Sequence, residues 1–72
     1  MEQYDYSKLL GRIKEKHYTQ ATLAKEIGLS EASLNMRLKN VLNFKQGDIL
    51  RIADTLGIPA AEIPAYFFTH QL

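Results

Sequence analysis

The first part of the chain carries apolar residues at the spacing of a helix. Four of them fall on one side of such a helix: Tyr6, Leu9, Leu10 and Ile13. This pattern predicts a helix over about residues 6 to 16 whose apolar side faces a core. Asp5 precedes it, where a carboxylate can accept hydrogen bonds from backbone N–H groups that have no partner in the first turn.

Two shorter helices, separated by only three residues, are predicted next. Thr19 is a suitable N-cap for the first, over residues 20 to 27, and Gly28 ends it because glycine tolerates a left-handed backbone. Ser30 is a suitable N-cap for the second, over residues 31 to 39. The apolar residues of this pair are expected to face the core: Leu23, Ala24, Ile27, Leu34 and Leu38.

The second half of the chain predicts one long helix and one short helix. A loop is expected over residues 40 to 45, where the apolar period is lost. Five apolar residues then form a broad stripe: Ile49, Leu50, Ile52, Ala53 and Leu56. Pro59 and Pro64 restrict the rest of the chain to one short helix around residues 60 to 63. Residues 65 to 72 are expected to form an aromatic tail. The fold class expected for the chain is all-α.

Length and composition fit a single small domain, residues 1 to 72, with one hydrophobic core. The chain has 72 residues, of which 46% are hydrophobic and 24% charged, as in ordinary soluble globular domains. It contains no cysteine, which excludes disulfides and thiolate metal sites and fits the reducing cytoplasm. Nowhere do about 18 apolar residues run together, so a membrane span is not expected.

Three residues in the middle of the chain have the spacing of a helix-turn-helix motif. Counted from Gln20, the fifth, ninth and fifteenth residues are Ala24, Gly28 and Leu34. Two helices that cross steeply need a small residue where they approach, a residue that tolerates positive φ in the turn, and an apolar anchor for the second helix. The spacing therefore predicts such a motif over about residues 19 to 39.

The outer side of the second helix of this motif fits the major groove of B-DNA. The candidate base-reading residues are Glu31, Ala32, Ser33, Asn35 and Met36. Polar and basic residues around this helix are candidates for holding phosphates: Thr19, Gln20, Arg37, Lys39, Asn40, Asn43 and Lys45. Although the net charge of the chain is only +1, four of its nine basic residues fall between Ser33 and Arg51, against one acid.

The sequence shows no constellation for catalysis or for a cofactor. His17 and His70 are far apart in sequence with no clustered carboxylates, which argues against a metal site. Asp54 and Glu62 lack a neighbour for acid–base chemistry, and there is no Gly-rich phosphate loop. The chain is therefore expected not to be an enzyme and to bind no metal, cofactor or small-molecule substrate.

Large apolar side chains raise a second interpretation, which is binding to another protein. Met36 lies on the predicted outer side, where it suits a thymine methyl or a protein partner. Tyr66, Phe67 and Phe68 are expected either to cover the core or to contact a partner, since three adjacent aromatic side chains cannot all point inward. A homodimer is also left open.

Residues 19 to 40, TQATLAKEIGLSEASLNMRLKN, resemble the helix-turn-helix of Cro/CI-type phage repressors. The likeness extends over most of the chain, because YDYSKLLGRIKEKHYTQ, GDILRIADTLGIP and AYFFT are similar to the modulator-of-repression (antirepressor) proteins of lactococcal temperate phages. The resemblance implies a five-helix, lambda-repressor-like domain in the cytoplasm of a bacterial host cell. It also implies a role in the lysis–lysogeny switch, through binding of operator DNA, of the phage CI repressor, or of both.

The resemblance places the family's base-reading positions on Glu31, Ala32, Ser33 and Met36. It places the family's phosphate-holding glutamine on Gln20. Many members read DNA with glutamine or arginine where this chain has Glu31 and Ala32, and many have an apolar residue where it has Arg37. Two hypotheses are retained: a regulator that reads double-stranded operator DNA, and an antirepressor module that binds the repressor without reading DNA sequence.

Overall fold

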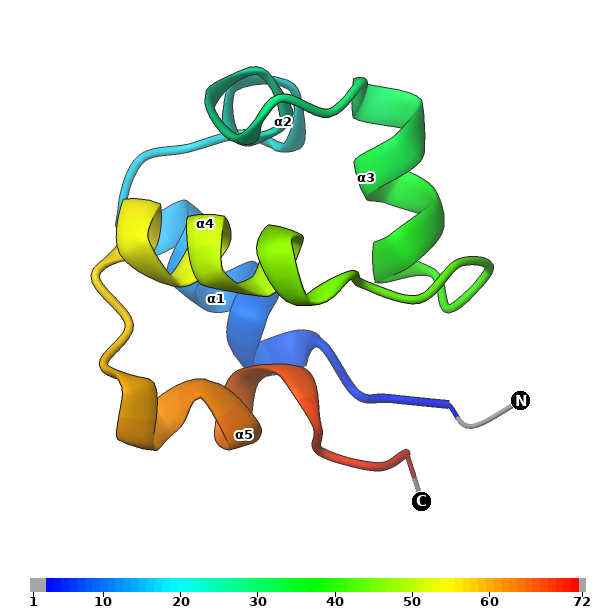
Figure 1. Ribbon diagram of the computed structural model, residues 1–72, viewed down its shortest axis with the longest axis vertical. Coiled ribbons are helices and arrows are strands. Elements are labelled where there is room, and N and C mark those ends of the chain that lie inside the picture. Colours follow the sequence, from blue (N-terminus) through cyan, green and yellow to red (C-terminus); the bar gives the residue numbers. More distant parts are fainter. Residues whose placement is uncertain (1–2, 72) are drawn as a thin grey trace.

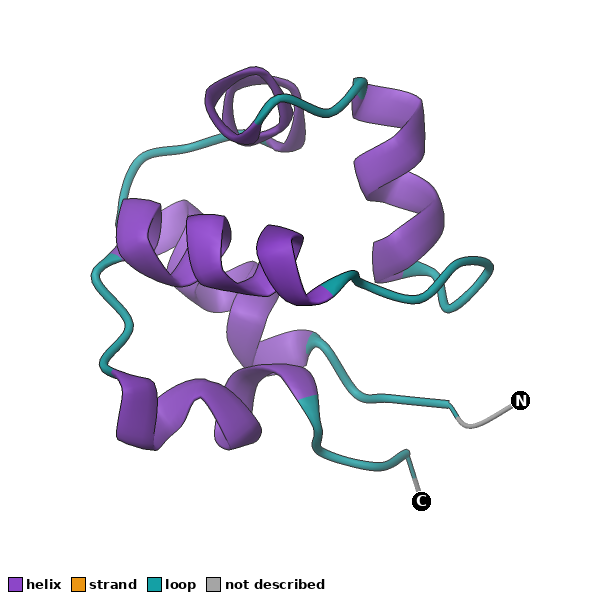
Figure 2. Ribbon diagram, in the orientation of Figure 1, coloured by secondary structure: helices purple, strands orange, loops and turns teal. Residues whose placement is uncertain are grey.

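The computed structural model describes residues 3 to 71, and within this range the chain forms helices and no strand. In chain order these are α1 (Ser7–Glu15), α2 (Gln20–Ile27), α3 (Glu31–Leu38), α4 (Gln46–Leu56), the 3-10 helix η1 (Ala60–Glu62) and α5 (Ile63–Phe67). Figure 2 shows that short loops join them. The prediction of an all-α fold is confirmed. In the part of the chain described, no helix combines the length and apolarity needed to cross a membrane.

The helices surround one core, with α4 crossing the middle of the molecule (Figure 1). In this view α1 lies behind α4, α2 above it and α5 below it, while α3 stands upright at one side. The two chain ends run together: Tyr4 and His70 form an isolated antiparallel bridge, and the Asp5 N–H donates to the Thr69 carbonyl oxygen at 2.7 Å. The segment before α1 is therefore held against the segment after α5.

Local hydrogen bonds define the ends of α2 and the start of α3. The Thr19 hydroxyl accepts from the Thr22 N–H at 3.1 Å, and the Thr22 hydroxyl accepts from the Thr19 N–H at 2.8 Å. The Ser30 hydroxyl accepts from the Ser33 N–H at 3.1 Å. Gly28 ends α2 with a φ of 79°, in the left-handed region that glycine adopts without a steric penalty. These predicted caps are confirmed.

Asp5 supports α1 from one position earlier than an N-cap. The helix begins at Ser7, with Tyr6 in the cap position, and the Asp5 carboxylate accepts from the Ser7 hydroxyl at 2.6 Å and from the Ser7 N–H at 2.8 Å. These two hydrogen bonds hold the pKa of the Asp5 carboxyl below its usual value. The expected interaction with the first turn is therefore present, displaced by one residue.

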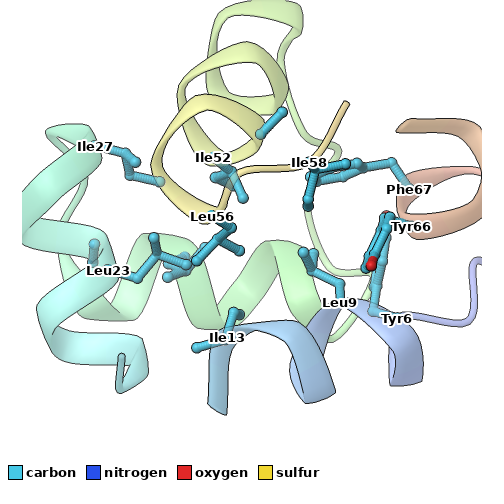
Figure 3. Close-up of a cluster of buried hydrophobic side chains, with 13 residues drawn as sticks. Tyr6, Leu9, Ile13, Leu23, Ile27, Ile52, Leu56, Ile58, Tyr66 and Phe67 are labelled. Atoms are coloured by element: carbon cyan, nitrogen blue, oxygen red, sulfur yellow. The ribbon is translucent and has the colours of Figure 1, made fainter. Parts of the chain in front are cut away.

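Side chains from all the α-helices meet in the core. Figure 3 shows Leu9 and Ile13 of α1, Leu23 and Ile27 of α2, Ile52 and Leu56 of α4, and Tyr66 and Phe67 of α5 converging on one another. Leu34 brings α3 into the same core with no exposed surface. Burial also raises the pKa of the Tyr6 phenol, because the charged phenolate is poorly solvated there. The predicted apolar faces are largely confirmed.

Two leucines expected in the core are exposed. Leu10 is 41% exposed on α1 and Leu50 is 55% exposed on α4. Each directly adjoins a core-facing residue, Leu9 and Ile49, and one residue turns a helix by about 100°, which carries the neighbouring side chain off the buried face. Leu38, also expected in the core, is only partly buried against it. The predicted stripes were therefore too wide.

The expected aromatic tail over residues 65 to 72 is wrong in its first part. η1 continues directly into α5, which reaches Phe67, and residue 72 lies outside the described residues. Pro64 does not break this helix because it occupies the first turn, where a backbone N–H has no helical acceptor. The helix turns Tyr66 and Phe67 inward, with 7% and 1% of their surfaces exposed.

We predict that Leu34→Ala lowers the free energy of unfolding by about 2–5 kcal/mol, because it empties space in a fully buried site. Leu50→Ala is the matched control: the same atoms are removed from an exposed site, and the loss should stay within about 0.5 kcal/mol. Denaturant unfolding followed by circular dichroism measures both. Equal losses would show that Leu34 does not anchor α3.

Candidate functional site

α2 and α3 are separate helices joined by a tight turn of three residues. In Figure 1, α2 is seen nearly end-on while α3 stands upright in the plane of the view, so the two cross steeply. The Leu29 N–H donates to the Ala24 carbonyl oxygen at 2.9 Å and closes the turn. Ala24 is 1% exposed and Leu34 fully buried. The burial of Ala24 and Leu34 and the left-handed φ of Gly28 agree with the roles that the spacing predicted for these three residues, while a helix-turn-helix motif that binds DNA stays a prediction.

The residues expected to read bases share the outer side of α3. We call these residues the α3 surface: Glu31, Ala32, Ser33, Asn35 and Met36. Glu31, Ala32 and Met36 are exposed, whereas Ser33 and Asn35 are half-buried. The surface therefore presents one carboxylate, three small or polar groups and one large apolar side chain. Contact of these residues with DNA stays a prediction.

A hydrogen bond ties the α3 surface to the start of α2. The Asn35 Nδ2 donates to the Gln20 Oε1 at 3.0 Å. This leaves the amide hydrogens of Gln20 and the Oδ1 of Asn35 available to a partner outside the chain. The two residues are fifteen positions apart on different helices, so helical periodicity did not indicate the pair.

Arg37 does not lie on the outer surface, and the expectation that it holds phosphate there is wrong. Only 6% of the residue is exposed, and its Nε donates to the Asp48 Oδ2 at 3.2 Å. One terminal nitrogen also donates to the Ser33 carbonyl oxygen at 3.0 Å and to the Ser33 hydroxyl. The physical reason is that α4 places a carboxylate next to the last turn of α3, where burial favours an ion pair over a free charge.

Asp48 connects three segments, a role that its sequence pattern did not indicate. Besides Arg37, its Oδ2 accepts the Lys45 N–H at 3.1 Å, which caps the start of α4, and its Oδ1 lies 3.6 Å from a guanidinium nitrogen of Arg51. The residue is 4% exposed. An acidic side chain in the first turn of a helix is a signal for capping, but not for the partner on α3.

Asn40 is occupied within the chain. Its backbone has a φ of 64°, and its amide accepts from the Tyr4 N–H at 2.8 Å and donates to the Tyr4 carbonyl oxygen at 3.0 Å. The side chain is therefore not free for the phosphate contact expected from the sequence. It holds the end of α3 against the N-terminal segment instead.

The remaining residues expected to hold phosphate form two groups. Thr19 and Gln20 lie at the N-terminus of α2, where the Thr19 hydroxyl already serves as a cap. Lys39, Asn43 and Lys45 lie between α3 and α4, and all three are exposed. With Arg37 buried, the exposed cations of this region are Lys39, Lys45 and Arg51, of which Arg51 lies 3.6 Å from an Asp48 oxygen.

Apolar side chains gather where α3 ends, and we call Met36, Val41 and Leu42 the apolar corner. Met36 is 37% exposed, Val41 55% and Leu42 41%. The N–H groups of Val41 and Leu42 both donate to the Met36 carbonyl oxygen, at 2.8 and 3.2 Å, which folds the loop back onto the end of α3. Exposed neighbouring apolar residues are typical of protein-binding surfaces.

Of the three aromatic residues considered for partner binding, two do not reach the surface. Tyr66 and Phe67 are buried core residues, so a direct partner contact through them is wrong and the alternative, that they cover the core, is confirmed. Phe68 is 48% exposed and lies edge-on to the Tyr4 ring, with centroids 6.1 Å apart. Only Phe68 among them is available to a partner.

We predict that Asp48→Ala lowers the free energy of unfolding by about 3–5 kcal/mol, because it leaves the Arg37 charge buried and unpaired. Asp54→Ala, which removes an exposed carboxylate from the same helix, should cost about 0.5 kcal/mol or less. Replacing both members of the pair, Arg37→Met with Asp48→Leu, should recover most of the loss. Denaturant unfolding measures the stability of each variant. If the double variant loses the sum of the two single losses, the two side chains are not a coupled pair.

Comparison with known proteins relates most of the chain to one group. No match is found among curated proteins. The chain is similar to the modulator of repression (MOR) of the temperate bacteriophage TP901-1 from Lactococcus lactis, whose solution structure it matches with a TM-score of 0.78 and 42% sequence identity, over 90% of this chain and 88% of that one. The resemblance to phage modulators of repression is thus confirmed, while the Cro/CI-type class stays a prediction. The family described as "Protein of unknown function (DUF739)" matches residues 2–70, and the chain therefore belongs to that family.

Proposed function

We propose that this protein regulates phage repression by binding the repressor protein through the α3 surface and the adjoining apolar corner. The observation that carries the proposal is the burial of Arg37 against Asp48, which removes the single arginine of α3 from the outer surface. A relative with 42% identity is named as a modulator of repression, which supports a role in the same process.

The exposed chemistry of α3 favours protein over DNA as its partner. Phosphate contacts supply much of the affinity of DNA-binding proteins, and exposed lysines and arginines contribute the electrostatic part of it. α3 has none, and its first residue, Glu31, is an exposed carboxylate that repels phosphate. Covering the apolar corner, which includes Met36, with another apolar surface removes it from water and so stabilises a complex.

The polar groups of the α3 surface provide specificity for such a partner. Ser33 accepts a hydrogen bond from Arg37, so its own hydroxyl proton is left to donate outward. Asn35 keeps its Oδ1 as an acceptor and Gln20 keeps its amide hydrogens as donors. A partner is therefore expected to bring an apolar side chain to Met36 and matching polar groups around it.

Operator DNA is the second candidate partner, and a specific group of residues favours it. The Gln20 amide, the N-terminus of α2 and the exposed Lys39 and Lys45 present hydrogen-bond donors and positive charge. Sequence-specific binding should then weaken about tenfold or more over a fourfold rise in salt. Fluorescence anisotropy with an operator duplex and a scrambled duplex tests this, since equal affinities argue against sequence-specific readout.

We predict that Met36→Glu weakens association with the purified phage repressor by about tenfold or more, because it places a charge where the proposed partner covers an apolar side chain. Leu50→Glu makes the same change at an exposed site on α4 and should alter affinity less than twofold. Isothermal titration calorimetry gives both affinities, with circular dichroism confirming folding. If the wild-type chain and the repressor migrate independently in size-exclusion chromatography at micromolar concentrations, the proposal is wrong.

A further inference from the structure

A shallow groove runs along α1 to the start of α2, and it shares no lining residue with the apolar corner. Its lining includes Leu10, Gly11, Ile13, Lys14, Tyr18 and Gln20. Leu10 is 41% exposed in it, and Tyr18 is half-buried. The groove therefore exposes apolar surface that the core of this chain does not cover.

The fold does not require a glycine at position 11, in the interior of α1. Its φ is not in the left-handed region, and a Cβ built on it would have no atom within 4 Å beyond its immediate surroundings in the helix. Alanine is the better helix former at such a position. Glycine at this point lowers the stability of α1 but leaves room for another backbone to approach it closely.

The charge along the groove favours an acidic partner. Lys14 lines the groove and has no ion pair within the described part of the chain, and no carboxylate lines it. The nearby Glu15 is already paired with Arg12 at 2.7 Å. A partner with a carboxylate beside an apolar side chain would therefore complement both features.

The groove is continuous with the α3 surface. Gln20 lines one end of the groove and accepts the hydrogen bond from Asn35 on α3. A protein that covers Met36 and Asn35 therefore reaches the groove by passing Gln20. Mostly apolar lining around a single lysine suits a protein segment better than a phosphate backbone.

We propose that this groove docks a helix of the repressor, packed closely over Gly11, with an apolar side chain against Leu10 and Tyr18 and a carboxylate near Lys14. The inference rests on the proposed function and extends the repressor interface from α3 to α1. Helix axes approach to a distance that depends on the side chains between them, and glycine allows the shorter distances. Gly11 is thus a determinant of binding rather than of folding.

Gly11→Ala tests this because it separates binding from stability. The variant should melt about 4 °C higher, since alanine favours the helix and meets no obstacle. It should nevertheless bind the purified repressor about fivefold more weakly, and the longer Gly11→Gln at least about tenfold more weakly, a loss equal to about 1.4 kcal/mol or more. Gly47→Ala is the matched control, another helical glycine whose added Cβ meets only the Arg51 side chain, at 3.7 Å, and its affinity should stay within twofold.

Lys14→Glu tests the charge, with Lys25→Glu as the control that makes the same change at an exposed site outside the groove. The first should weaken repressor binding about fivefold, and the second less than twofold.

If the Gly11 and Lys14 variants bind as the wild type does while Met36→Glu binds weakly, the groove inference is overturned and the proposed function stands. If Gly11→Gln weakens binding only to an operator duplex, the groove serves DNA and the inference is again overturned. Absence of repressor binding by the wild type overturns both.

Discussion

The buried ion pair between Arg37 and Asp48 decides the character of the outer surface of this protein. It joins the end of α3 to the first turn of α4, and the same guanidinium also reaches Ser33. A guanidinium can be buried only where its charge and its hydrogen-bond donors are satisfied. Because the pair withdraws the arginine of α3 from solvent, the groups left for a partner are one carboxylate, a few polar groups and a methionine.

Several independent constraints hold α3 in its position around that pair. Leu34 anchors it in the core, the left-handed Gly28 sets the turn before it, and Asn40 ties its end to the N-terminal segment. Since each acts on a different part of the helix, α3 has little freedom to rotate or slide. A rigidly held helix presents its side chains to a partner without a large loss of conformational entropy on binding.

The exposed apolar side chains are notable because the protein is small. A chain of this size buries a limited core, so nearly every large apolar residue is needed inside. Apolar side chains that remain outside, such as Met36, Val41 and Leu10, are therefore informative. The chain is 42% identical to a phage modulator of repression, and these side chains are the basis of the protein-binding surface proposed above.

The sequence by itself determined the helices, their caps and most of the core. Thr19, Ser30 and Gly28 act on backbone groups within a few residues, and Leu34 follows from helical period, so local pattern was sufficient. Only the tertiary structure decided the roles of Arg37 and Asn40, whose partners lie 11 and 36 residues away, and the inward turn of Tyr66. The physical reason is that the role of a charged or amide side chain depends on the group packed against it. Local spacing in the sequence does not specify that neighbour.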